Sequence, residues 1–181
     1  APSGGEILHD EGVELTGVLV DRAMVLINLP EPDMDEVQRR YLAAQERCLS
    51  MGLTCVHDAG ISAANLDDLR MLDKVGKWRL RTYAMLAADQ TDAIRKGPWQ
   101  SRDGLITVRA VKGYADGALG SRGASLLAAY SDRPDWRGNG NRPIARGPIE
   151  HLAKRCAAAG MQLCMHAIGD AANRSVLEVY A

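Results

Sequence analysis

Strand-like and helix-like segments alternate along most of this sequence, and this alternation limits the fold more than any other feature. Apolar strand-like runs end at His57, Ala87, Lys112 and His166, and each is followed, directly or after a loop, by a helical pattern. The first three strand ends lie roughly 25 to 30 residues apart, which suits a minimal βα unit. This order predicts parallel strands joined by right-handed helical crossovers.

The expected fold class is therefore α/β, as part of a TIM (β/α)₈ barrel or as a doubly wound sheet. A whole barrel needs about 250 residues, so 181 residues supply about four βα units. The first part of the chain differs, because residues 6–9 and 15–20 are predicted to pair as a hairpin. We expect a lead-in hairpin segment over residues 1–32 and a partial barrel over residues 33–181.

Several helix starts are marked by capping residues. Asp33 is a predicted N-cap, with Glu36 three residues later as its capping-box partner. Ser62 is expected to begin the next helix of the repeat. Asp170 stands where the last helix begins, so capping is its expected role.

Composition restricts the partners of this chain. A net charge of −1 gives no general attraction to nucleic acid or to anionic membranes. No apolar run approaches the roughly 20 residues that span a bilayer. The four cysteines form no C-x-x-C pair, so we expect reduced thiols in a cytoplasmic protein.

His166 is the first candidate for chemistry. Strand alternation places Gln162, Cys164 and His166 on one face, which in a barrel faces inward and brings His166 to the mouth. An imidazole there suits zinc or a similar metal. A buried histidine bonded to a backbone carbonyl is an equally acceptable interpretation.

Lys112 ends its strand in the same way. Alternation places it on one face with Val108 and Ala110. A buried neutral amine can add carbon dioxide to give a carbamate, an anionic ligand able to bridge two metals; a lysine extending to solvent is the alternative. Arg109 would then face the helices, and a β-bulge there would shift the register.

The Gly-rich turn at residues 116–123 follows that strand. Asp116 is placed to pair with Lys112 or to contact substrate, and Arg122 is suited to clamp a carboxylate or a phosphate. The spacing of the glycines fits neither common phosphate-binding motif. A phosphate cradle therefore remains a weak alternative.

His57 is the remaining histidine at a strand end. It is predicted to contact substrate or to serve as an outer ligand at the same mouth, and a structural hydrogen bond is as acceptable. His9 lies on the expected hairpin and His151 on a helix surface, and neither is assigned a role.

Five blocks of the sequence together resemble the amidohydrolase superfamily, specifically the amidohydrolase family 3 group that includes N-substituted formamide deformylases. The most specific blocks are VKGYADGALGSRGA and MHAIGD, and the others cover residues 2–7 with 15–19, 52–60 and 80–86. The resemblance implies a metal-dependent TIM-barrel hydrolase acting on non-peptide C–N bonds of a small amide-type substrate, with barrel strands two to five present here. It implies a carboxylated strand-four lysine at Lys112 and a strand-five histidine ligand at His166.

The sequence also departs from that family. It lacks the strand-one His-x-His, the strand-six histidine and the strand-eight aspartate that serves as the family's usual base, so no catalytic residue is identified. Two ligands fall short of the three that a catalytic zinc normally requires. We expect a parent enzyme with one or two divalent metals, zinc being favoured, and an inactive chain on its own.

Two other functions remain open at this point. A non-catalytic βα scaffold or interaction domain would bind no metal, and the edge strands of a half-barrel would favour self-association into homo-oligomers. A phosphate- or nucleotide-binding βα domain would instead use the Gly-rich turn at residues 116–123.

Overall fold

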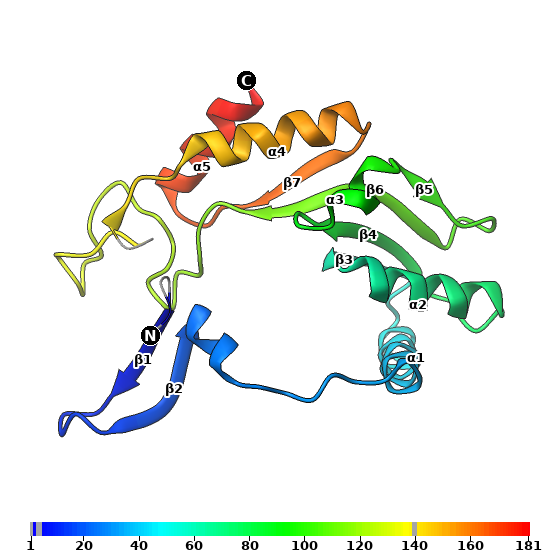
Figure 1. Cartoon of the computed structure of the whole chain (residues 1–181), viewed down its shortest axis with the longest axis horizontal. Helices are drawn as coiled ribbons and strands as arrows, with labels where there is room; N and C mark the ends of the chain where they lie inside the picture. Colours follow the sequence, from blue (N-terminus) through cyan, green and yellow to red (C-terminus); the bar gives the residue numbers. More distant parts are fainter. Residues whose placement is uncertain (1, 3–4, 139–140) are drawn as a thin grey trace. The chain divides into compact units, whose positions relative to one another are not determined.

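The computed structural model describes residues 2, 5–138 and 141–181 of the chain. The colours in Figure 1 follow the elements in sequence order, from β1 to α5. The chain divides into two compact units: unit 1 comprises Ala1–Pro30, Tyr114–Ile149 and Met165–Ala181, and unit 2 comprises Glu31–Gly113 and Glu150–Cys164. Ser3 and Gly4, which belong to the first block of the family resemblance, lie outside the described residues. Among the described residues, none of the helices combines the length and apolar character that a bilayer crossing requires.

Unit 2 contains the repeating βα pattern. Its elements are α1 (Met34–Ser50), β3 (Cys55–Ile61), α2 (Ala63–Lys74), β4 (Arg81–Ala87), α3 (Thr91–Arg95) and β5 (Trp99–Gln100), with most of β6 (Ile106–Tyr114), α4 (Arg146–Ala158) and β7 (Gln162–His166). The strand order is β3-β4-β6, with β5 and β7 also paired to β6. The pairs β3–β4 and β4–β6 are parallel, as predicted, whereas β5 runs antiparallel to β6 and was not predicted.

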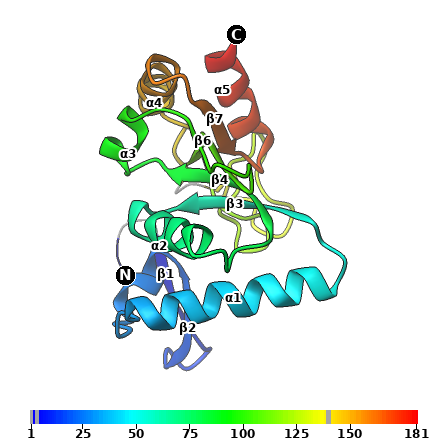
Figure 2. The same cartoon turned by 90° about the vertical axis from the view of Figure 1, so that its right-hand side faces the viewer.

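One face of this sheet packs against helices. Strand residues Ala84, Leu86, Val108 and Val111 share a buried cluster with helix residues. The helix residues of this cluster are Leu66, Leu69, Leu72, Ile94 and Cys156. Helices α1 and α2 lie side by side, as Figure 2 shows. Burial of these aliphatic side chains is the main favourable contribution to the stability of unit 2.

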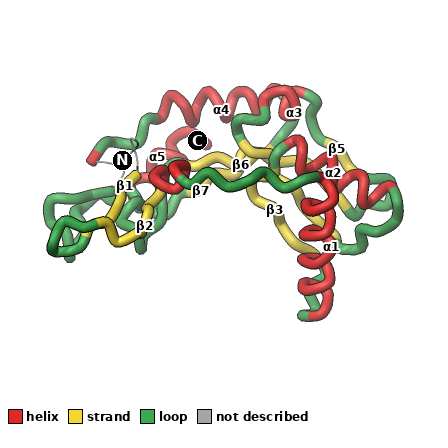
Figure 3. Tube along the Cα trace, turned by 60° about the horizontal axis from the view of Figure 1, so that its bottom comes forward, coloured by secondary structure: helices red, strands yellow, loops and turns green. Residues whose placement is uncertain are grey.

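Unit 1 begins with the predicted hairpin. Strands β1 (Gly5–His9) and β2 (Leu15–Asp21) pair in the antiparallel direction and lead into the 3₁₀ helix η1 (Arg22–Leu26). Residues 115–138 and 141–145 follow β6 and are largely irregular (Figure 3). The helix α5 (Asp170–Tyr180) follows β7.

The helix starts agree only partly with the predicted caps. The Asp33 carboxylate accepts a hydrogen bond from the Glu36 amide at 2.7 Å, which confirms the predicted N-cap. The carboxylate of Glu36, however, pairs with Arg39 and Arg40 along the helix, which competes with the predicted capping-box contact. Ser62 caps α2, as predicted.

Asp170 is not the N-cap residue that was predicted, although its carboxylate accepts a hydrogen bond from the first-turn amide of Ala171 at 2.9 Å. The N-cap of α5 is Gly169, and Asp170 is the first helical residue. The Asp170 carboxylate accepts a hydrogen bond from the amide of Leu127, at 2.8 Å, in the loop that follows β6. It therefore joins the loop to the helix, because a non-local donor is available that the local sequence does not reveal.

Candidate metal-ligand and loop-anchoring site

Lys112 lies on the face of the unit 2 sheet that is opposite the helices. Its register partner is Ala87 on β4, and its neighbour in sequence, Val111, is fully buried in the helix-packed core. Because side chains alternate along a strand, Lys112 points away from that core. Its positive charge also acts on the Cys164 thiol, although burial dominates and raises the pKa of Cys164.

A β-bulge gives Lys112 this orientation. Ala84 pairs with Val108 and Met85 pairs with Ala110, so Arg109 is the extra residue on β6. The predicted bulge is therefore present, and Arg109 is exposed rather than buried under helices. The prediction that Val108 shares a face with Lys112 is wrong, because the bulge reverses the alternation and Val108 lies in the core.

His57 lies on this same open face of unit 2. The predicted strand end at His57 is wrong, because β3 continues to Ile61. It is exposed, and its ring centroid is 5.2 Å from that of Tyr83, its register partner on β4. Asp58, the next residue, is half-buried, and burial raises the pKa of its carboxyl group. Tyr41 on α1 has its pKa raised to about 12, by burial and secondarily by the charges of Asp58 and Asp68.

His166 ends β7 in unit 1 and is partly exposed. Its Nε2 atom lies 3.3 Å from the carbonyl oxygen of Gly117 and 3.8 Å from Oδ1 of Asp116. Its ring centroid is 5.5 Å from that of Tyr114. A carbonyl oxygen can only accept a hydrogen bond, so Nε2 carries the proton in this contact and the lone pair of the neutral ring lies on Nδ1.

Asp116 anchors the loop that follows β6. Its side chain is 0% exposed, yet its oxygens accept three backbone hydrogen bonds. Oδ1 accepts from the amide of Ile168 at 3.0 Å, and Oδ2 accepts from those of Ser125 and Gly169, both at 2.8 Å. Three donors compensate a buried carboxylate for the loss of water.

Gly169 lets these segments come close together. A Cβ atom at this position would overlap the carbonyl oxygen of Ser125. That oxygen also accepts a hydrogen bond from the amide of Ala171 at 3.2 Å. Neither Ser125 nor Gly169 was predicted to belong to the site. The Gly-Asp pair after a strand was the local signal, and the partners of both residues are distant in sequence.

Arg122 is held inside the same loop. Its guanidinium pairs with Asp132 at 2.6 Å, and its carbonyl oxygen accepts from Nε1 of Trp136 at 2.7 Å. The Asp132 partner raises the pKa of Arg122, and Arg122 lowers that of Asp132. Arg122 also has a positive φ of 56°, which is unusual for a residue with a side chain.

The two candidate metal ligands belong to different units, Lys112 to unit 2 and His166 to unit 1, and each is described in its own unit. Within residues 2, 5–138 and 141–181, no three His, Cys, Asp or Glu side chains gather as a metal site would require. An imidazole and an amine that can become a carbamate are suitable zinc donors, but they do not complete a site.

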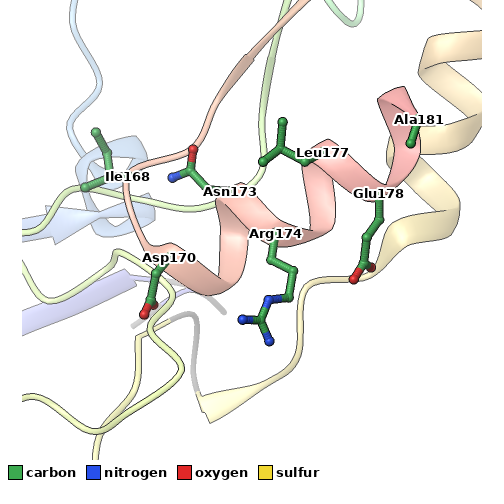
Figure 4. Close-up of a pocket in the computed structure, with 7 residues that line it drawn as sticks. All are labelled: Ile168, Asp170, Asn173, Arg174, Leu177, Glu178 and Ala181. Carbon is green, nitrogen blue, oxygen red and sulfur yellow. The ribbon is translucent and has the colours of Figure 1, made fainter.

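A depression in unit 1 lies along α5 rather than at His166. Figure 4 shows the residues that line it. They are Ile168, Asp170, Asn173, Arg174, Leu177, Glu178 and Ala181. Asn173 lies near the amino-terminal end of α5, and its side-chain amide donates hydrogen bonds to the carbonyl oxygens of Ala167 and Gly169. These contacts hold the start of α5 against the turn that follows His166.

A parallel α/β sheet with candidate ligands near its strand ends is typical of βα enzymes of many kinds. A comparison with known families gives the assignment. The family model described as "Amidohydrolase family" matches residues 1–181, so the chain belongs to this family. The family resemblance inferred from the sequence blocks is therefore confirmed. Specificity for N-substituted formamides stays a prediction.

Two curated relatives match nearly the whole chain. The protein YtcJ of Bacillus subtilis (strain 168), which carries the name of an amidohydrolase, is 31% identical over 97% of this chain and 34% of its own length. Protein LONG AFTER FAR-RED 3 of Arabidopsis thaliana is 27% identical over 99% of this chain and 33% of its own length. The chain thus spans about a third of the length of these relatives.

Two solved structures share the fold. Both are described as uncharacterized metal-dependent hydrolases, one from Pyrococcus horikoshii OT3 and one from Pyrococcus furiosus. Each aligns with a TM-score of 0.79 over 95% of this chain, at 27% and 24% identity, and the matches cover 36% and 37% of those structures. The predicted α/β fold, as part of a barrel of this type, is confirmed.

Proposed function

We propose that this chain forms part of a metal-dependent amidohydrolase that hydrolyses non-peptide C–N bonds in a small amide-type substrate. The observation that carries the proposal is the family match over residues 1–181. The two solved structures named as metal-dependent hydrolases support the need for a divalent metal. The relatives are about three times as long, so the activity is proposed for the whole enzyme.

Lys112 and His166 are the proposed metal ligands, with zinc as the favoured metal and one or two ions bound. When bound, the metal would lower the pKa of a coordinated water and polarise the scissile carbonyl. His166 would contribute Nδ1, because its Nε2–H faces the Gly117 carbonyl oxygen. The assignment of Nδ1 as the donor atom follows from the contact between Nε2 and the Gly117 carbonyl oxygen.

Lys112 would contribute through a carbamate. Carbon dioxide adds to a neutral amine and releases one proton, and the product is an anionic oxygen ligand. Two small residues lie on the same face as Lys112, its register partner Ala87 on β4 and Ala110 on β6. The bulge at Arg109 keeps this amine out of the helix-packed core.

The outer part of the proposed site contains His57, Asp116 and Arg122. His57 is exposed beside Tyr83 and is proposed to contact substrate. Arg122 holds an exposed ion pair with Asp132, which an anionic substrate group can compete for. Asp116 has its oxygens on backbone amides, so we propose a supporting role for it.

Metal binding tests the ligand assignment directly. We expect the affinity for zinc to fall at least about tenfold in His166→Gln and in Lys112→Met. Calorimetry measures the affinity, and elemental analysis measures the zinc content. His151→Gln is the matched control, because His151 is exposed on α4. Unchanged zinc binding in both ligand variants would refute the assignment. A ¹³C carbamate signal that disappears in Lys112→Met would support the modified lysine.

Activity of the 181-residue chain tests its completeness. Two protein ligands fall short of the usual three, so we expect no amide hydrolysis by the purified chain with zinc added. Amide hydrolysis by the purified chain that is lost in His166→Gln would contradict this expectation. It would show that the 181 residues are sufficient for activity.

The Gly-rich turn gives little support to phosphate binding. Its amides at Gly117, Gly123 and Ala124 donate to carbonyl oxygens within the turn itself. We propose a small-molecule partner and a cytoplasmic location, because a net charge of −1 gives no general attraction to nucleic acid or anionic membranes. Self-association through sheet edges remains a prediction that light scattering can test.

A further inference from the structure

Asp116 connects three segments of unit 1 that are far apart in the sequence. Asp116 lies at the start of the loop that follows β6. Ser125 lies nine residues later in the same loop, and Ile168 and Gly169 follow β7. All three amides point at one fully buried carboxylate. Removing the carboxylate would leave the amides of the buried residues Ser125 and Gly169, and that of the exposed Ile168, without this acceptor. The loss is costly for the two buried donors.

The same carboxylate acts on His166. Oδ1 lies 3.8 Å from Nε2 of His166, while the adjacent residue, Gly117, places its carbonyl oxygen 3.3 Å from the same nitrogen. A negative charge and a carbonyl dipole on one side of the ring both favour a proton on Nε2 over a proton on Nδ1. Asp116 therefore bears on both the position and the tautomer of the ring.

We infer that Asp116 is a positioning residue for His166, which fixes the loop and the turn around the imidazole and holds its neutral form as the Nε2–H tautomer. The inference rests on the proposed function only for its consequence, which is that Nδ1 is presented to the metal. The hydrogen bonds and the tautomer themselves can be measured in the metal-free protein.

Nuclear magnetic resonance of the wild-type protein gives the first test. We expect through-hydrogen-bond couplings from the amides of Ser125, Ile168 and Gly169 to the carboxyl carbon of Asp116. At alkaline pH, where imidazole side chains are neutral, the ¹⁵N shifts of His166 should show the proton on Nε2. The His166→Gln spectrum assigns the signal among four histidines. Missing couplings or an Nδ1–H tautomer would overturn the inference.

Asp116→Asn gives the second test. An amide side chain offers one acceptor oxygen, so its NH₂ group must face at least one backbone N–H. We expect the three amides to exchange hydrogen about tenfold faster, and the His166 ¹⁵N shifts to move toward a mixture of tautomers.

Asp132→Asn is the matched control. Asp132 is an exposed acidic residue that pairs with Arg122 within the same unit, and its loss should change neither measurement. Unchanged His166 shifts in Asp116→Asn would overturn the positioning role, even if the amides exchange faster. If that variant does not fold, the wild-type couplings and tautomer decide. Failure of the metal proposal would appear separately, as zinc binding that survives His166→Gln.

Discussion

The two units are stabilised by different kinds of contact. Unit 2 buries a continuous set of aliphatic side chains between its sheet and its helices. In unit 1, the carboxylates of Asp116 and Asp170 instead connect distant stretches of backbone. The contrast teaches that a scaffold can rely on apolar area, whereas a loop beside a candidate ligand relies on directional hydrogen bonds that fix its position.

Their apolar side chains differ in the same way. Leu69 and Leu72 of unit 2 are each 1% exposed, whereas Val13 and Leu29 of unit 1 are 77% and 74% exposed. Unit 1 therefore gains less from apolar burial near its hairpin. Substitutions of single residues should reproduce this difference.

Leu69→Ala should have the largest effect. It removes a fully buried side chain from α2 and leaves a cavity, so the free energy of unfolding should fall by about 2–5 kcal/mol. Urea denaturation measures the change. Met71→Ala in the same helix is the control, since Met71 is 47% exposed, and it should change stability by less than about 1 kcal/mol. Equal effects would show that apolar burial does not dominate unit 2.

Gly169→Ala should come next and should act in unit 1. The added methyl group overlaps the Ser125 carbonyl oxygen, so we expect a loss of about 1–3 kcal/mol and faster hydrogen exchange at Ser125 and Ala171. Gly147→Ala is the control, because nothing lies within 4 Å of a Cβ there. Protection that persists in Gly169→Ala would mean that the loop is not packed against this turn.

Much of the fold could be predicted from the sequence because its signals are local. Apolar runs and capping residues such as Asp33 and Ser62 identified β3, β4, β6, β7 and the helices between them. The two-residue strand β5 carries too few residues to show a period. The bulge was predictable because Arg109 is a charged residue that would otherwise face the core.

The candidate site could be predicted less completely. His166 ends β7 and Lys112 lies near the end of β6. This position is a local signal, and their role as ligands remains a proposal. The contacts of Asp116 with Ser125 and Gly169 depend on how distant segments meet. A carboxylate before a glycine is consistent with many roles, so one sequence does not indicate which amides it will accept from.

Tyr41 should make a smaller, pH-dependent contribution in unit 2. Its pKa is raised to about 12 in the folded protein, from the ordinary value of 10.0 for a tyrosine. Its contribution to stability is therefore present below about pH 10 and is lost as the pH rises toward about 12. Tyr41→Phe should flatten the decline of stability in this range, and absorbance near 295 nm should lose one late-titrating phenol. An unchanged titration curve would contradict the shift.

Asp132→Asn should have the smallest effect on stability. The Arg122–Asp132 pair is exposed on both sides, so we expect a loss of at most about 1 kcal/mol that shrinks further in high salt. Thermal unfolding at two ionic strengths measures it. A loss comparable with that of Gly169→Ala would indicate that the loop depends on this pair as strongly as on close backbone packing.

The extra residue on β6 has a consequence for natural variation in chain length. Deleting Arg109 would leave an uninterrupted ladder in which Ala110 still pairs with Met85 and Lys112 still pairs with Ala87. Shortening the strand between Ala110 and Lys112 would instead rotate the amine toward the helices. Related sequences that are one residue shorter in this strand should therefore have lost a residue at the position of Arg109. They should not have lost one between Ala110 and Lys112.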